Sequence, residues 1–284
     1  MRKHKPPRSV AIIGPGRIGQ ALGRLLVQRG APIAYIAGRN PSAARQAVRF
    51  IGQGEPLVVA DPRLRGASIF LLTTSDSALG QVAKSLAGQG SDKMSWRGKV
   101  VLHTCGSLSS AVLRPFKLRG AAVGSLHPYQ TVPSRQAGVR SLLHCFWGIE
   151  GDARALRVAR HWVKLLEGVP FPVRAERKTL YHLAAFLACP TVVTLMEQST
   201  LLLKKAGVPL RIARPMLTRF VSETARNFAE MGARRALTGP AVRGDWVTIE
   251  RHLSALKRTA PEFVPVYRTL LQAMLRLAGR KTPH

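Results

Sequence analysis

The first apolar run of the chain ends in a glycine turn, and this feature limits most strongly what the chain can fold into. Val10–Ile13 reads as a buried strand, and the next six residues, GPGRIG, precede a helical pattern. A strand, a Gly-x-Gly-x-x-Gly turn and a helix in succession are the fingerprint of a dinucleotide-binding unit. The glycines allow a tight turn, close approach of a pyrophosphate and close helix packing. We predict that the cofactor contacts Gly14, Gly16, Arg17, Ile18 and Gly19.

Short β-branched runs alternate with helical patterns through the first 174 residues. The runs that read as buried strands are residues 10–13, 33–37, 57–60, 68–72, 99–103 and 121–126. Helical patterns lie between them at 17–29, 41–52, 76–87 and 108–116. Continuous apolar strands separated by helices are typical of a parallel sheet covered on both faces. The predicted fold class is therefore α/β, a Rossmann-type doubly wound parallel sheet, which the runs 145–150 and 170–174 would extend.

Only helical patterns follow residue 175. They cover residues 177–206, 210–231, 246–259 and 262–279. We therefore predict two domains, a nucleotide-binding domain over 1–174 and an all-helical domain over 175–284. The longest apolar window, 183–196, is shorter than the roughly 20 residues of a membrane span. It predicts a buried helix, and no membrane association is expected.

The residues after the second predicted strand favour NADP over NAD. Sheets that bind NAD usually carry an acidic residue about 20 residues after the glycine turn, where it binds the ribose hydroxyls. Here Arg39 and Asn40 occupy that place, and no carboxylate lies between Gly19 and Glu55. A guanidinium complements a 2′-phosphate. We predict that Arg39 and Asn40 bind the adenosine end of NADP; the alternative is that Arg39 is an ordinary surface arginine.

Three later loops follow predicted strands at the edge where such sheets bind ligands. The first, LLTTSDSAL, places Thr73 and Thr74 near the cofactor. The second, VVLHTCGSLSS, places His103 near the cofactor and Ser107 near the reacting atoms, and the third, GSLHPYQTV, carries His127. A histidine there is a candidate for proton transfer because its pKa lies near neutrality. A structural hydrogen bond is the alternative for each histidine.

The formal net charge of +30 does not by itself indicate a nucleic-acid partner. It is spread along the chain, +16 in residues 1–150 and +14 in residues 151–284. In a protein that binds nucleic acid, the basic residues are usually concentrated in one stripe or tail. Three interpretations of this charge remain open: a generally basic surface, electrostatic steering of small anions, and nonspecific adhesion to nucleic acid. Three cysteines without Cys-x-x-Cys spacing indicate neither a disulfide framework nor a metal site, and a cytoplasmic protein is expected.

Several motifs together resemble a known family. The segments that carry this resemblance are GPGRIG, LHTCGSLSS, SLHPYQT, YHLAAFLA and ALTGPAVRGDWVTIERHLSAL. The chain resembles the uncharacterised Rossmann-like oxidoreductases that carry a C-terminal helical domain of unknown function. These are related to 6-phosphogluconate dehydrogenase, pyrroline-5-carboxylate reductase and ketopantoate reductase. The resemblance implies an NADP-dependent oxidoreductase of a small anionic metabolite (keto or hydroxy acid, or imine), working as a homodimer through the helical domain. The cleft residues it implies are His103, Ser107, His127, His182, Arg243 and Asp245.

The chain departs from this family at one place. Relatives tend to read a small residue and Asn where this chain has Cys189 and Pro190, so the expected amide is absent. The proline should kink the helix. In the related 3-hydroxyacid dehydrogenases a catalytic lysine lies four residues earlier, which here is Phe186. We therefore expect His127 or His182 as the proton donor and Arg243 as the anchor of an anionic substrate, with Ser107 as a further catalytic candidate. A regulatory or non-catalytic NADP(H)-binding protein is the alternative.

Overall fold

The computed structural model describes residues 9–88 and 95–280, and its contacts divide the chain into two units. The first unit ends at Cys189 and the second begins at Pro190. The change from alternating strands and helices to helices alone falls earlier, at Ala175. The first helix of the helical part therefore belongs, by its contacts, to the first unit.

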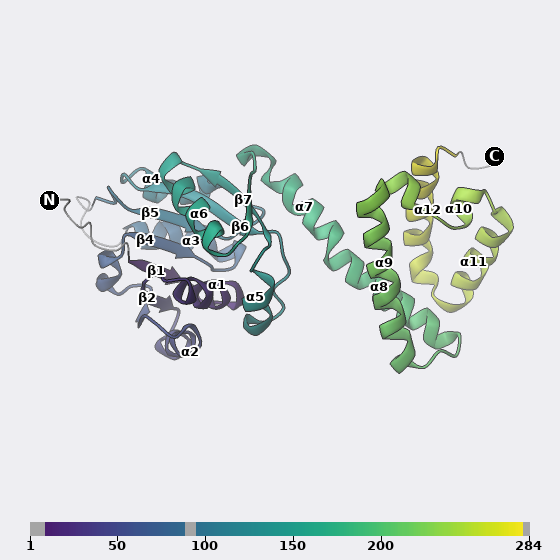
Figure 1. Cartoon of the computed structure of the whole chain (residues 1–284), viewed down its shortest axis with the longest axis horizontal. Helices are drawn as coiled ribbons and strands as arrows, with labels where there is room; N and C mark the ends of the chain where they lie inside the picture. Colours follow the sequence, from purple (N-terminus) through teal and green to yellow (C-terminus); the bar gives the residue numbers. More distant parts are fainter. Residues whose placement is uncertain (1–8, 89–94, 281–284) are drawn as a thin grey trace. The chain divides into compact units, whose positions relative to one another are not determined.

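The first unit is built on an eight-stranded sheet with the strand order β3-β2-β1-β4-β5-β6-β7-β8. The strands are β1 (Val10–Ile13), β2 (Ile33–Gly38), β3 (Glu55–Val58), β4 (Ile69–Leu72), β5 (Val100–His103), β6 (Ala122–Pro128), β7 (Phe146–Gly151) and β8 (Val169–Pro172). The predicted Rossmann-type α/β sheet is confirmed, and most of its labelled strands can be followed in Figure 1. One strand departs from the parallel arrangement, because β7 pairs with β6 in the antiparallel direction.

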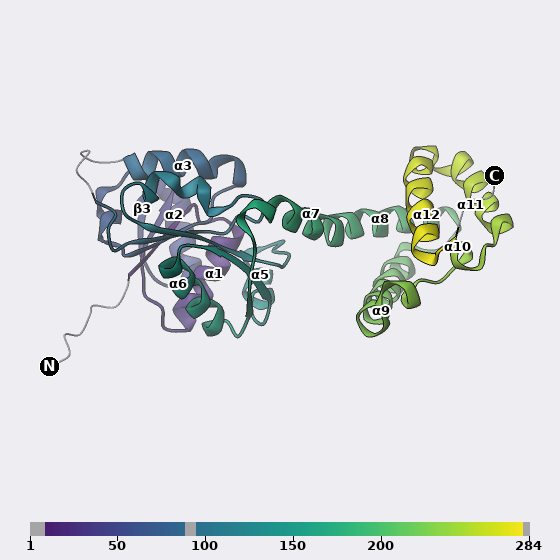
Figure 2. The ribbon, with the colours of Figure 1, turned by 90° about the horizontal axis from the view of Figure 1, so that it is seen from above.

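Helices cover both faces of this sheet and bury two apolar layers. One layer packs under α1 (Arg17–Gln28), α2 (Pro41–Ile51), α5 (Arg135–Ser141) and α6 (Ala153–Leu165). The other packs under η1 (Pro62–Gly66), α3 (Asp76–Gly88), η2 (Ser110–Leu113) and α4 (Arg114–Lys117). Adjacent residues of a strand face opposite layers, as Ile12 and Ile13 do, so both must be apolar. Figure 2 shows α3 and α6 on opposite sides of the strands.

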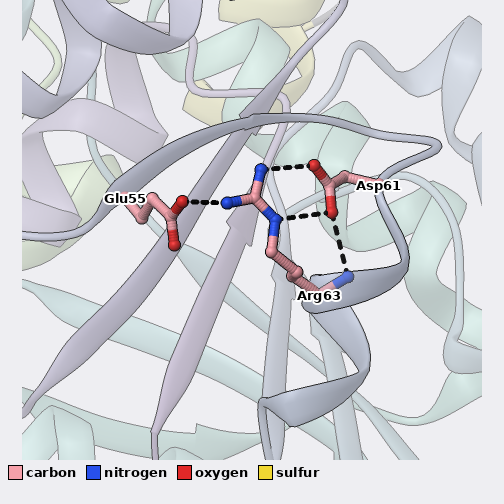
Figure 3. A network of polar contacts seen from close by, with 3 residues as sticks. All are labelled: Glu55, Asp61 and Arg63. Atoms are coloured by element: carbon pink, nitrogen blue, oxygen red, sulfur yellow. Dashed lines mark hydrogen bonds and ion pairs between the residues drawn. The ribbon is translucent and has the colours of Figure 1, made fainter.

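An ion-pair network orients the segment between β3 and β4. Arg63 donates through Nε and Nη2 to the two carboxylate oxygens of Asp61, at 3.0 and 2.7 Å, and through Nη1 to Glu55 (Figure 3). The side-chain hydrogen bond from Arg63 lowers the pKa of Asp61. Because exposed ion pairs contribute little to stability, this network mainly fixes the direction of η1.

The second unit is helical, as predicted. It contains α8 (Pro190–Lys205), α9 (Leu210–Ala236), α10 (Pro240–Arg243), α11 (Trp246–Thr259), η4 (Pro261–Phe263) and α12 (Val264–Ala278). Within α9, Gly232 has a positive φ of 75° and interrupts the helix. The α10–α11 turn is closed by Gly244, also with positive φ.

The apolar stretch over 183–196 is helical, but the prediction of one buried helix is wrong. Helix α7 (Lys178–Ala188) ends before Cys189, which has non-helical angles (φ −123°, ψ −81°), so the predicted kink at Pro190 is confirmed. Leu183, Phe186 and Val193 are 48%, 54% and 64% exposed. In the described part of the chain, Ala175–Lys205 is the one helical stretch whose length and hydropathy would allow a membrane span, which is weak evidence for one. An apolar composition predicts that a helix is covered, but it does not predict which surface covers it.

Candidate functional site

Two of the three turn glycines are required by the packing of the fold itself. Gly14 has a φ of +73°, and its N–H donates to the Ala37 carbonyl at 2.8 Å. A Cβ added to Gly14 would lie 2.3 Å from Cγ2 of Thr74. A Cβ added to Gly19 would lie 2.1 Å from Oγ1 of Thr73. Strand β1, helix α1 and the end of β4 therefore approach one another too closely for any larger residue.

Gly16 is different, because nothing in the protein fills the space beside it. A Cβ there would meet no atom closer than the Thr73 carbonyl oxygen, at 3.8 Å, and its φ of −73° suits any residue. Helix α1 begins at the next residue with no acidic side chain in its first turn, and the first N–H groups of a helix lack intrahelical acceptors. The space and the N–H groups together fit the pyrophosphate of a dinucleotide. Arg17 lies at this turn, with its guanidinium bonded to the Pro133 carbonyl at 3.0 Å.

The two threonines after β4 have different roles at the turn. The Thr73 hydroxyl donates to the Gly14 carbonyl at 2.7 Å, which fastens the end of β4 to the turn. The Thr74 hydroxyl is buried and has no hydrogen-bond partner among the described residues. A buried unpaired hydroxyl is costly, so this oxygen has unused capacity to bind a ligand.

The end of β2 presents a cation, as the NADP prediction requires. Arg39 follows the strand directly and is exposed. Asn40 is the N-cap of α2, where its Oδ1 accepts the Ala43 N–H at 2.8 Å. The amide oxygen of Asn40 is therefore committed to the helix.

A row of three polar residues lies on one face of the sheet, one residue on each of the strands β5, β6 and β7. The register pairs His103 with Ser125 and Ser125 with Glu150. His103 has no exposed surface, and its Nδ1 accepts the Cys105 N–H at 3.1 Å. Burial, and then the charge of Lys178, lower the pKa of His103 to about 3. This histidine is therefore neutral, and its observed contact is a structural hydrogen bond.

The structure brings His127 and His182 together above the loop that follows β5. The centroids of the two imidazole rings are 6.1 Å apart. A Cβ added to Gly106 would lie 2.7 Å from His127 Nε2 and 2.6 Å from His182 Cδ2, so both rings contact this glycine. His127 Nδ1 lies 2.7 Å from the hydroxyl of Tyr181. Burial, followed by the charges of Lys178 and His182, lowers the pKa of His127 to about 3.

Ser107 is held by a carboxylate from α3. Its hydroxyl donates to Oδ2 of Asp76 at 2.9 Å and lies 3.3 Å from the sulfur of Cys105. Burial raises the pKa of the Cys105 thiol, which also accepts the Leu108 N–H at 3.3 Å. The loop is thus fixed by its own hydrogen bonds. Among the described residues, no cluster of His, Cys, Asp or Glu is arranged to hold a metal ion.

The sequence matches two known domain families, one in each part of the chain. Residues 2–128 match a Rossmann-like domain, and residues 145–274 match DUF2520, a domain of unknown function. The chain joins a Rossmann-like domain to a DUF2520 domain. Among curated proteins, none matches the sequence.

Solved structures share this two-part fold at low sequence identity. A putative NADP oxidoreductase from Bacteroides fragilis is 23% identical, with a TM-score of 0.75 over 95% of this chain and 98% of its own. A protein from Thermotoga maritima is 23% identical, with a TM-score of 0.76 over 95% and 99%. A reductive aminase from Aspergillus terreus, in complex with NADPH and ethyl-5-oxohexanoate, is 16% identical, with a TM-score of 0.66 over 96% of both chains. At these identities the likeness establishes the fold.

Lys178 is a further residue of this cluster that was not predicted; it is the first residue of α7 and part of the DUF2520 domain. Its side chain is 2% exposed, and its Nζ donates to Ser125 Oγ at 2.7 Å and to the Cys105 carbonyl at 3.1 Å. Burial lowers the pKa of Lys178, and the negative charge of Glu150 opposes that effect. The sequence gives no local signal, because Lys178 follows Arg177 in a chain with 44 basic residues.

The remaining predicted residues lie in the second unit, within the DUF2520 domain. Arg243 is exposed at the end of α10. Asp245 accepts the Thr248 N–H at 3.0 Å and the Thr248 hydroxyl at 2.7 Å, and these bonds lower its pKa. Asp245 is therefore the N-cap of α11. The contact of Arg243 with a substrate stays a prediction.

Proposed function

We propose that this protein is an NADP-dependent oxidoreductase that transfers hydride between the nicotinamide and a carbonyl, imine or hydroxyl carbon of a small anionic metabolite. The observation that carries the proposal is the open space at Gly16, between two glycines that the fold itself requires. Solved structures described as a putative NADP oxidoreductase and as a reductive aminase with NADPH share the fold, which supports the same class.

The cofactor would be held by the glycine turn and by the end of β2. The N–H groups that begin α1 would bind the pyrophosphate, and the unpaired Thr74 hydroxyl would bind beside it. Arg39 would pair with the 2′-phosphate. A charge-assisted hydrogen bond of about 1.5–3 kcal/mol corresponds to a preference of roughly tenfold to 150-fold for NADP over NAD. When bound, NADP supplies the hydride chemistry.

The polar cluster would orient the substrate and move its proton. Because burial raises the pKa of Tyr181, its hydroxyl stays protonated and can donate to His127 Nδ1. The proton of the neutral His127 then lies on Nε2, which faces Gly106 and can polarise a substrate oxygen or nitrogen. His127 is too weak a base to carry a second proton at neutral pH, so we assign proton transfer to His182. Ser107, oriented by Asp76, would bind a polar substrate atom, and Arg243 its anionic group.

A second candidate function is NADP(H) binding without turnover. It is favoured by Phe186 and Pro190, which stand where related dehydrogenases carry a lysine and an asparagine. Measurable oxidation of NADPH with any compound in a panel of keto acids and imines would exclude it. Tight binding without oxidation across that panel would favour it over the enzyme.

We also propose a cytoplasmic homodimer formed through the second unit. Helices α8 and α9 form an apolar groove of about 880 Å³, and Phe220 on its wall is 70% exposed. Arg219 and Glu223 line the same groove, so two copies that pair through it about a twofold axis can bring opposite charges together. A Phe220→Asp variant should be monomeric by light scattering while the parent is dimeric; a monomeric parent would refute the dimer.

Isothermal titration with NADPH and NADH tests the cofactor assignment. Arg39→Asp should weaken NADPH binding at least tenfold and leave NADH binding unchanged or stronger. Arg49→Asp, an exposed arginine near the end of α2, is the matched control and should change neither. Unchanged NADPH preference in Arg39→Asp would refute the role of Arg39. Failure of the parent protein to bind either dinucleotide would refute the proposed function.

A further inference from the structure

Lys178 connects the three segments that carry Ser107, His127 and His182. Its Nζ donates to the Cys105 carbonyl, in the loop that leads into Gly106 and Ser107. It also donates to Ser125 on β6, two residues before His127. The lysine itself begins α7, the helix of Tyr181 and His182. One ammonium group therefore connects the loop after β5, strand β6 and helix α7.

Burial of this ammonium is informative because Lys178 is the only described residue of α7 that is buried. A buried charge is unfavourable unless acceptors surround it, and an apolar residue of similar volume often serves packing equally well. Here the acceptors are a backbone carbonyl and a hydroxyl, and Nζ lies 5.5 Å from the centroid of the Tyr181 ring. The carboxylate that attracts it most strongly, Glu150, is itself bonded to the N–H and hydroxyl of Ser110. Lys178 therefore has no dedicated ion-pair partner among the described residues.

We propose that Lys178 is a positioning residue for the reaction: by binding the Cys105 carbonyl and Ser125, its ammonium holds Gly106 beneath the two imidazoles. The inference rests on the proposed function, in which neutral His127 donates a hydrogen bond to the substrate. Lys178 touches neither substrate nor cofactor in this role. It acts through the Cys105 carbonyl, through Ser125 and through its positive charge.

The charge effect depends on every group that faces His127. Lys178 and His182 disfavour its protonation, and Asp76 from α3 favours it. His103 from β5 also disfavours it, and Tyr181 bonds its Nδ1. Burial is the largest cause of the low pKa, and Lys178 is the largest of the charges. Removing the lysine charge should therefore raise the pKa of His127 while its burial persists.

The test is a titration of His127 by nuclear magnetic resonance in the full chain without cofactor. In Lys178→Met the pKa of His127 should rise clearly above that of the parent, whereas in Lys178→Arg, which keeps the charge, it should stay low. Lys84→Met removes an exposed lysine of α3 and is the matched control, with no expected change. If Lys178→Met does not fold, Ser125→Ala removes a single acceptor and should alter the chemical shifts of His127 and Gly106 together.

Activity measurements separate this inference from the proposed function. Once a substrate is known, Lys178→Met should lower kcat at least tenfold and leave the Kd for NADPH within about threefold, because the glycine turn is a different contact. An unchanged His127 titration in Lys178→Met, or unaltered Gly106 and His127 shifts in Ser125→Ala, would overturn the role of Lys178. Absence of NADPH binding in the parent would instead overturn the proposed function, and the His127 titration would still report on the lysine.

Discussion

Replacing Gly16 with alanine should separate the needs of the fold from those of the cofactor. The added Cβ would meet no protein atom closer than 3.8 Å, and a φ of −73° suits alanine. Removing a glycine stabilises the folded state by about 0.4–1 kcal/mol through the unfolded chain. Losing glycine as the N-cap costs about 0.5–1 kcal/mol. These effects nearly cancel, so the free energy of unfolding without cofactor should change by less than about 0.5 kcal/mol.

NADPH binding by this variant should nevertheless be much weaker. The methyl group would occupy the space through which a pyrophosphate approaches the backbone, and overpacking of one methyl costs about 1–3 kcal/mol. The Kd for NADPH should therefore rise about fivefold to 150-fold. Urea unfolding gives the stability, and isothermal titration gives the Kd. As a second check, NADPH at 100 times the Kd should stabilise the parent by about 2.7 kcal/mol.

Gly14→Ala is the matched control at the same turn. Its φ of +73° costs an alanine about 1–2 kcal/mol, and the 2.3 Å approach to Thr74 adds an overpacking cost of about 1–3 kcal/mol. This variant should lose about 2–5 kcal/mol of stability even without cofactor. The reasoning is refuted if Gly16→Ala binds NADPH like the parent, or if it is destabilised as strongly as Gly14→Ala.

Three further predictions concern the polar cluster. Gly106→Ala should lose about 1–3 kcal/mol of stability in urea, because its Cβ would lie within 2.7 Å of atoms in both His127 and His182, yet NADPH affinity should persist. Tyr181→Phe leaves a buried nitrogen unpaired and should cost about 1–3 kcal/mol; equal stability would show that water replaces the hydroxyl. In the folded protein, the pKa of His103 and that of His127 are both about 3, so both side chains stay neutral down to about that pH. In the unfolded chain their pKa is about 6.5, and they bind protons below that pH. Stability should therefore fall as pH drops from 6.5 toward 3, by up to about 1.4 kcal/mol per pH unit for each histidine, and His127→Gln should remove the share of that histidine.

The sequence could predict those features that depend on neighbouring residues. The glycine turn is encoded by six consecutive residues, and each buried strand by its own apolar run, so β1 to β6 appear close to their expected places. The kink at Pro190 is also a local effect, because proline disrupts the helix in which it stands. The reversed direction of β7 depends on how the chain returns after β6, and no single run encodes it.

The candidate site depends on contacts between distant residues, and there the sequence was less informative. His127 could be selected because it follows a predicted strand at the edge where such sheets bind ligands, and His182 because the family resemblance implies it. Lys178 could not, because its meaning comes from Ser125 and Cys105, which are 53 and 73 residues away in sequence. Exposure of the 183–196 stretch likewise depends on which surfaces meet in the fold, and composition does not specify them.

The hydroxyl of Thr73 reaches the Gly14 carbonyl while the same oxygen closes off the position where Gly19 would carry a side chain. These three positions can therefore tolerate change only as a set, and single substitutions among them should be harmful in any genetic screen. To alter the nucleotide preference, the residue to exchange is therefore Arg39, because it takes no part in these contacts and can be replaced without disturbing the turn.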